Sequence, residues 1–183
     1  DDYVALDALG SECATVTTEF ENVPADALDY LTKFIPVHPA ASAVAVCQNR
    51  IAEKTFLADN GLPHGPFAVI RGEDDVRNAN AELFPAILKV ARFGYDGKGQ
   101  ATVHNREEAL IAFGRFKGEH CVLEQRLTLD YEVSVVLARD DRKIRIAVAK
   151  ALAGAVPDPA ARQIIDRAIT PAFQPGDHAG GLT

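Results

Sequence analysis

Strand-like and helix-like segments alternate along this chain, and this alternation constrains its fold more than any other feature. Apolar residues recur at helical spacing in 24–34 and 49–60. Short apolar or β-branched runs at 67–70, 85–90 and 120–125 predict strands. Chains with this alternation form helices packed on a sheet. We therefore predict a mixed α/β (α+β) fold.

Further elements are expected around these segments. Helices are predicted at 40–46, 74–83 and 106–116, and a strand at 14–18. Residues 3–9 predict the end of a helix that stops at Gly10, since glycine favours the left-handed conformation found after a helix. The β-branched runs 131–139 and 143–148 predict a hairpin around a turn at Asp140-Asp141.

The acidic balance of the 183-residue chain limits its partners. Its 26 acidic and 19 basic side chains give a net charge of −7, whereas nucleic-acid binding needs a basic face. The sequence has no apolar run of membrane-spanning length and no signal-peptide pattern. We therefore expect no nucleic-acid or membrane partner and a cytoplasmic location. The three widely spaced cysteines form no C-x-x-C pair, so we expect buried thiols and no zinc site.

A glycine-rich loop follows the predicted strand at 85–90. The strand carries Lys89, and the loop Gly94–Gln100 has three glycines in its first six residues. Glycines allow backbone N–H groups to approach an anion closely, and Lys89 and Lys98 add positive charge. The segment predicts a phosphate cradle, although it matches neither the Walker A nor the dinucleotide pattern. A solvated hairpin loop is the alternative.

Acidic residues lie near the ends of predicted strands. Glu124 ends one strand and Glu132 begins another. The first can accept a hydrogen bond from an amine and the second from ribose hydroxyls; two exposed strand-edge acids are the alternative. The acidic segment Thr18–Pro24 suits a helix N-cap, with ligand contact at a strand end as the alternative.

Taken in order, these segments resemble one enzyme family. The segments are Thr17–Pro24, Gln48-Asn49-Arg50 with Lys54, Lys89 with Phe93–Gln100, and Glu124 with Asp130–Ser134. Over about residues 11–148 the chain resembles N5-carboxyaminoimidazole ribonucleotide synthetase, the ATPase subunit of phosphoribosylaminoimidazole carboxylase, which is an ATP-grasp ligase. The sequence Gly-Tyr-Asp-Gly-Lys-Gly-Gln after a lysine-bearing strand is quite specific to that family.

The resemblance implies a reaction of de novo purine (IMP) biosynthesis. In that family ATP phosphorylates bicarbonate to carboxyphosphate, and the carboxyl group passes to the exocyclic amine of 5-aminoimidazole ribonucleotide. It implies ATP and Mg²⁺ as cofactors and a carboxyaminoimidazole ribonucleotide mutase as a pathway partner, and it allows a homodimer. Another ATP-grasp carboxylate–amine ligase, or a nucleotide-binding module without catalysis, is the alternative.

The resemblance also implies roles for particular residues. The implied ATP-binding residues are Arg50, Lys89, Gly94, Tyr95, Asp96, Gly97, Lys98, Gly99, Gln100, Glu124, Gln125, Arg126, Leu127 and Glu132. Lys89 would contact phosphate oxygens, Glu124 would accept from the adenine amino group, and Glu132 would bind the ribose. Tyr95 and Asp96 would also face the aminoimidazole substrate. The family's magnesium ligands have no counterpart in this sequence, so no metal ligand is predicted.

The family's domains divide the chain into four expected parts. Residues 1–62 would be the end of a Rossmann-like domain with connecting helices, and 63–127 the ATP-grasp lid subdomain. Residues 128–170 would be a divergent start of the C-terminal grasp subdomain, and 171–183 a loop or disordered tail. The family's first strand and its segments after about residue 148 are not found, so we expect an incomplete copy.

Overall fold

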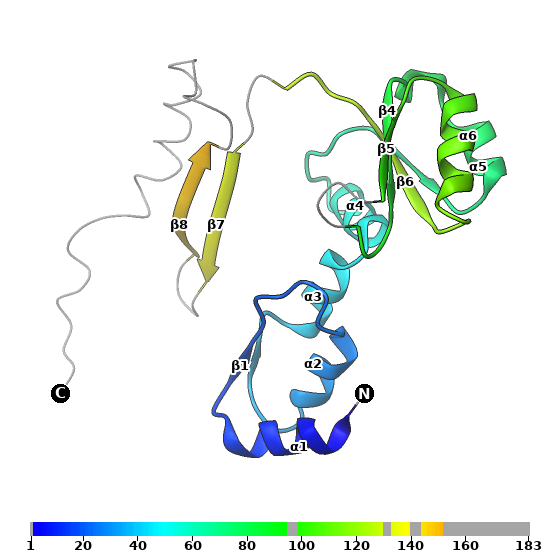
Figure 1. Cartoon of the computed structure of the whole chain (residues 1–183). Helices are drawn as coiled ribbons and strands as arrows, with labels where there is room; N and C mark the ends of the chain where they lie inside the picture. Colours follow the sequence, from blue (N-terminus) through cyan, green and yellow to red (C-terminus); the bar gives the residue numbers. More distant parts are fainter. Residues whose placement is uncertain (1, 95–98, 130–132, 140–143, 152–183) are drawn as a thin grey trace. The chain divides into compact units, whose positions relative to one another are not determined.

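The computed structural model describes residues 2–94, 99–129, 133–139 and 144–151 (Figure 1). They belong to two units that divide after Leu127. Within these ranges no helix is long and apolar enough to cross a membrane. The predicted turn at Asp140-Asp141 and the predicted tail at 171–183 lie outside the described residues.

The N-terminal part of the first unit is a small helical layer beside two short parallel strands. Its elements are α1 (Tyr3–Glu12), β1 (Val16–Thr17), α2 (Ala25–Leu31), β2 (Val37–His38) and α3 (Ala41–Cys47). Leu28 and Leu31 of α2 pack with Val37 and with Ala41 and Val44 of α3, all buried. The helical periodicity of the sequence therefore marks the correct buried face of α2.

The predicted helix stop at Gly10 is wrong. Helix α1 continues through Gly10 to Glu12. Gly10 is buried against Phe34, and a Cβ at this glycine would lie 3.1 Å from the Phe34 Cβ. The glycine allows the helix to pack closely on the chain and does not end it. Phe34, predicted to be on the apolar face of a helix, follows the end of α2 and is half exposed.

The rest of the first unit is an antiparallel sheet with helices. The strands follow the spatial order β3 (Phe67–Ile70), β6 (Cys121–Gln125), β4 (Ala86–Val90) and β5 (Gln100–Val103). The helices are α4 (Arg50–Asp59), α5 (Glu73–Asn78), the 3-10 helix η1 (Ala81–Leu83) and α6 (Arg106–Arg115). Helices α5 and α6 lie on one side of the sheet, and α4 contacts β6 (Figure 1).

The two faces of this sheet differ because side chains alternate along each strand. Leu88 and Leu123, paired in register, lie fully buried on the face that packs against Val76 of α5 and Phe113 of α6. The opposite face carries the next positions along each strand. There Ile87 pairs with Glu124 and Lys89 pairs with Val122. One face is therefore the hydrophobic core, and the other holds charged side chains.

In this sheet-and-helix part of the first unit, two elements differ from the sequence prediction. The helix expected at 74–83 is divided into α5 and η1. Asn80 is the N-cap of η1, and its side chain accepts a hydrogen bond from the Glu82 N–H at 3.0 Å. Strand β5 was not predicted. Its four residues are short and partly polar, and their strand conformation comes from pairing with β4.

The second unit contains an antiparallel pair among its described residues. Strand β7 (Val133–Arg139) pairs with β8 (Ile144–Ala151), with a register shift between Val136 and Leu137. This pair confirms the antiparallel pairing predicted from the alternating β-branched pattern; the predicted turn between the strands stays a prediction.

Candidate functional site

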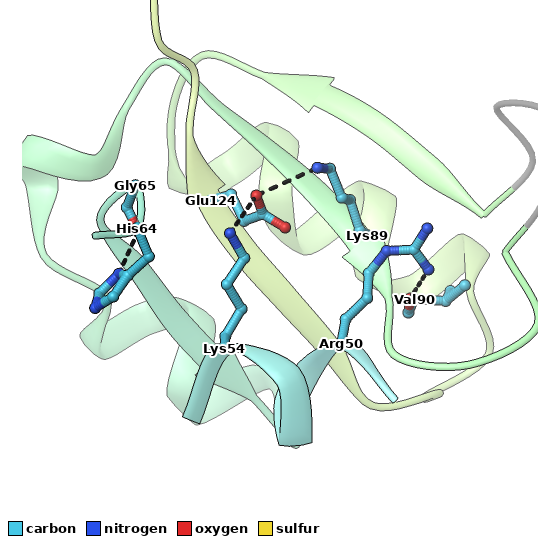
Figure 2. A network of polar contacts seen from close by, with 7 residues as sticks. All are labelled: Arg50, Lys54, His64, Gly65, Lys89, Val90 and Glu124. Carbon is cyan, nitrogen blue, oxygen red and sulfur yellow. Dashed lines mark hydrogen bonds and ion pairs between the residues drawn. The ribbon is translucent and has the colours of Figure 1, made fainter. Parts of the chain in front are cut away.

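Two lysines converge on one carboxylate on the charged face of the sheet (Figure 2). The Nζ of Lys89, from β4, lies 3.2 Å from the Glu124 Oε2. The Nζ of Lys54, from α4, lies 3.2 Å from the same oxygen. The three side chains are only 16–24% exposed. Water therefore screens these ion pairs less than pairs on an open surface.

The first residue of helix α4, Arg50, is hydrogen-bonded to the end of strand β4. The Asn49 side chain caps the helix by accepting from the N–H of Ile51 at 2.9 Å. The Arg50 N–H donates to the Ala91 carbonyl at 2.9 Å, and the Arg50 guanidinium donates to the Val90 carbonyl at 3.2 Å. These bonds fix the direction in which α4 presents Arg50, and hence the side chains that follow it.

The cluster of Arg50, Lys54, Lys89 and Glu124 has a net positive charge, opposite in sign to that of the whole chain. Among the residues that meet here, Arg50, Lys54 and Lys89 carry positive charges and Glu124 carries a negative one (Figure 2). The chain as a whole has a net charge of −7. A local excess of partly buried cations attracts anions more strongly than net charge suggests. The arrangement suits a phosphorylated ligand.

The glycine-rich loop returns to β4 at Gly99. This residue has φ +74°, and a Cβ here would lie 2.5 Å from the Val90 Cγ2. The Val90 N–H donates to the Gly99 carbonyl at 2.8 Å. Only glycine fits both this conformation and this approach. Gln100 then pairs in register with Lys89, so the end of the loop lies directly beside the lysine.

The segment after β6 is held by backbone bonds. The N–H of Gln125 donates to the Pro66 carbonyl at 2.9 Å, and the N–H of Arg126 donates to the Pro85 carbonyl at 2.8 Å. These two N–H groups are therefore engaged within the protein, and other backbone groups of Gln125–Leu127 would have to contact an adenine ring. Leu127 is half exposed.

Not every predicted site residue can be placed. The structure brings together Arg50, Lys89, Gln100 and Glu124 on or beside the charged face. Gly94 and Gly99 mark the two described ends of the loop. The predicted residues outside the described part of the chain are Tyr95, Asp96, Gly97, Lys98 and Glu132.

Lys54 belongs to the segments that carry the resemblance but was not among the predicted site residues, although it reaches Glu124 in the structure. Its signal was present, because Arg50 and Lys54 are four residues apart and thus share one face of a helix. That face lies toward β6, where Lys54 meets Glu124. Periodicity gives the shared face, but only the packing of α4 on the sheet shows which residue it contacts.

The acidic segment Thr18–Pro24 does not cap α2. The N-cap of this helix is Pro24, with no side-chain hydrogen bond, so the N-cap interpretation is wrong. Its residues 18–21 instead line a hollow of about 200 Å³ with Pro39, Ala43, Val44 and Cys47. A second hollow of about 520 Å³ lies where β4 ends, bordered by Arg92, Phe93 and residues 117–120.

The expectation that the cysteines are buried holds for only part of them. Cys121 is buried, Cys13 is partly exposed and Cys47 is exposed; all three are free thiols. Within the described residues, no three His, Cys, Asp or Glu side chains are close enough to bind a metal ion together.

Comparison with known proteins defines the class. The ATP-grasp domain model matches residues 55–150, and the ribonucleotide synthetase preATP-grasp domain model matches residues 1–48. The chain belongs to the ATP-grasp family. The predicted resemblance and the α+β ATP-grasp fold are therefore confirmed. A TPM domain model matches residues 124–183 and overlaps the ATP-grasp match.

Individual relatives give a more specific likeness than the domain models do. The chain is 36% identical over 139 residues to N5-carboxyaminoimidazole ribonucleotide synthase from Pseudomonas aeruginosa, covering 75% of this chain and 39% of that one. It is similar to the N5-carboxyaminoimidazole ribonucleotide synthetase structure from Thermus thermophilus (35% identity, TM-score 0.74, 82% and 41% covered). It is also similar to the Staphylococcus aureus N5-carboxyaminoimidazole synthetase structure complexed with ADP (27% identity, TM-score 0.79, 92% and 48% covered). The chain thus spans less than half the length of each.

Proposed function

We propose that this chain is part of an enzyme that carboxylates 5-aminoimidazole ribonucleotide. The reaction would use ATP and bicarbonate, pass through carboxyphosphate, and yield N5-carboxyaminoimidazole ribonucleotide for purine biosynthesis. The observation that carries the proposal is the meeting of Lys89 and Glu124 beside the glycine loop, on the sheet face opposite the core. The names of the relatives support the choice of substrate over that of other ATP-grasp ligases.

The described residues suit the nucleotide part of this reaction. Lys89 would neutralise phosphate oxygens. The loop Gly94–Gln100, of which Gly94, Gly99 and Gln100 are described, would offer backbone N–H groups to them. Glu124 would accept from the adenine amino group. Arg50 would bind the nucleotide from the start of α4. Phosphoryl transfer depends mostly on positioning and charge neutralisation, which such groups supply.

Other roles in the proposal rest on the family alone. Tyr95 and Asp96 would face the aminoimidazole substrate, and Glu132 would bind the ribose. Mg²⁺ would neutralise charge between the phosphates, but we assign it no residue, because the described residues hold no suitable cluster. A homodimer, a mutase acting next in the pathway and a cytoplasmic location belong to the same proposal.

A chimeric enzyme tests the function. Residues 1–148 would replace the matching segment of the Pseudomonas aeruginosa synthase, which would supply the remaining parts. We expect phosphate release from ATP, with Mg²⁺ and bicarbonate, to rise when 5-aminoimidazole ribonucleotide is added. The same chimera with Lys89→Ala is the control and should lose the response. A chimera that melts cooperatively but ignores the ribonucleotide would contradict the proposal.

A further inference from the structure

The shared oxygen of Glu124 poses a problem for the proposed nucleotide site. Lys54 and Lys89 both lie 3.2 Å from the Glu124 Oε2, whereas the second oxygen takes no part in these two ion pairs. If Lys89 turns toward a phosphate, it must leave Glu124. A carboxylate that is only 16% exposed would then lose a partner, and an unpaired, partly buried charge is costly.

Lys54 is placed to remove this cost. It approaches Glu124 from α4, whereas Lys89 approaches from β4 (Figure 2). The Asn49 cap and the hydrogen bonds of Arg50 to the end of β4 hold helix α4 in place, so the backbone of Lys54 is fixed relative to the sheet. Its side chain is 17% exposed, which limits competition from water. It can therefore keep Glu124 paired when Lys89 leaves.

Like charges on one oxygen also favour the exchange. Two ammonium groups bound to the same carboxylate oxygen repel each other, and this repulsion weakens the hold of Glu124 on each. A phosphate that takes Lys89 relieves the repulsion and leaves a neutral Lys54–Glu124 pair. Without Lys54, Glu124 and Lys89 would form a neutral pair that the phosphate would have to break.

We propose that Lys54 is a positioning residue that holds Glu124 in place, so that Lys89 is free to bind the nucleotide phosphates. This inference rests on the proposed nucleotide site and adds to it a residue that touches no nucleotide. Lys54 acts through Glu124: it keeps the adenine-facing carboxylate charged and oriented, and it supplies the charge balance that lets Lys89 change partners.

Binding of ADP to the 183-residue chain, measured by calorimetry, tests the role. Lys54→Gln should weaken ADP binding about fivefold, the scale of one partly screened ion pair. Lys54→Arg keeps the charge and should restore affinity to within about twofold of the unaltered chain. Lys33→Gln is the matched control, because Lys33 follows helix α2, is exposed and lies over the Tyr30 ring; this variant should bind ADP normally.

A double-mutant cycle separates this role from the alternatives. In a Glu124→Gln background, Lys54→Gln should change ADP affinity less than about twofold, because its target is gone. An equal loss in both backgrounds would mean direct contact with ADP and would overturn the inference. A lower melting temperature for Lys54→Gln with unchanged ADP affinity, or no restoration by Lys54→Arg, would also overturn it. Failure of the unaltered chain to bind ADP would instead reject the proposed nucleotide site itself.

Discussion

Lys89 and Glu124 lie on neighbouring antiparallel strands and point to the same side of the sheet, with the lysine Nζ 3.2 Å from the carboxylate Oε2. The next residue toward the N-terminus on each strand, Leu88 and Leu123, is fully buried on the other side. The alternation of side chains along each strand thus places a charged residue directly after a core residue.

Removal of the Lys89 charge should weaken nucleotide binding. Lys89→Ala in the chimeric enzyme should cost about 1–3 kcal/mol of ATP binding free energy, the scale of a lost charge-assisted hydrogen bond. Calorimetric titration with a non-hydrolysable ATP analogue measures this loss. Lys33→Ala removes an equal charge elsewhere and should leave the affinity unchanged. An affinity equal to that of the parent chimera would remove Lys89 from the site.

Gly99 should be less tolerant of a side chain than other glycines with positive φ. Gly61→Ala is the control, because Gly61 has φ +63° and no atom lies within 4 Å of an added Cβ. It should cost about 1–2 kcal/mol of unfolding free energy through its backbone alone. Gly99→Ala adds overlap with Val90 and should cost about 1–3 kcal/mol more. Urea unfolding measures both; equal costs would show that Val90 is not in contact.

The cysteines should differ sharply in reactivity. Burial, with a smaller contribution from Glu119, raises the pKa of the Cys121 thiol to about 12, so almost no thiolate exists at pH 8. Cys47 is exposed. At pH 8 a thiol reagent should label Cys47 quickly and Cys121 only after unfolding in guanidinium. Rapid labelling of Cys121 in a folded Cys47→Ser variant would contradict its burial.

The same thiol should make stability depend on alkaline pH. The pKa of Cys121 is higher in the folded chain than in the unfolded chain, so the folded state retains a proton that the unfolded state loses. Its stabilising contribution is complete below about pH 8.5, the ordinary thiol pKa, and decreases as pH rises toward 12. The unfolding free energy should therefore fall more between pH 8 and 10.5 for the natural chain than for Cys121→Ala.

The 183-residue chain by itself should not catalyse carboxylation. It spans 39% of the Pseudomonas aeruginosa relative, and its described residues form no metal-binding cluster. Phosphoryl transfer needs neutralisation of developing charge, so the rate should be lower by many powers of ten. The assay is ATP hydrolysis with Mg²⁺, bicarbonate and 5-aminoimidazole ribonucleotide. Turnover close to that of a complete synthase would show that this chain contains groups we have not identified.

Sequence patterns were sufficient for elements with strong local signals. The apolar run at 67–70 and the Asn49-capped helix are found where they were predicted, because local propensity and packing agree there. Strand β5 was missed because its conformation depends on pairing with β4, which is distant information. Gly10 was misinterpreted for a similar reason, since its neighbour Phe34 is remote in sequence.

In the candidate site, too, local motifs could be predicted and contacts between distant residues could not. The lysine strand, the glycine loop and Glu124 carry motifs, so their grouping could be expected from the family. Lys54 also belongs to these segments, but its contact with Glu124 could not be expected, because it depends on how α4 packs against β6. Helical spacing relates Lys54 to Arg50, but no spacing rule relates it to a strand seventy residues later.

The central claim is that the sheet face bearing Lys89 and Glu124 binds ATP. Amide chemical shifts of the ¹⁵N-labelled chain, titrated with a non-hydrolysable ATP analogue, test it most directly. The account predicts that the largest shifts occur at 87–89, 99–102 and 122–127, with helices α5 and α6 on the opposite face unaffected. A spectrum that does not change, or shifts confined to α5 and α6, would contradict it.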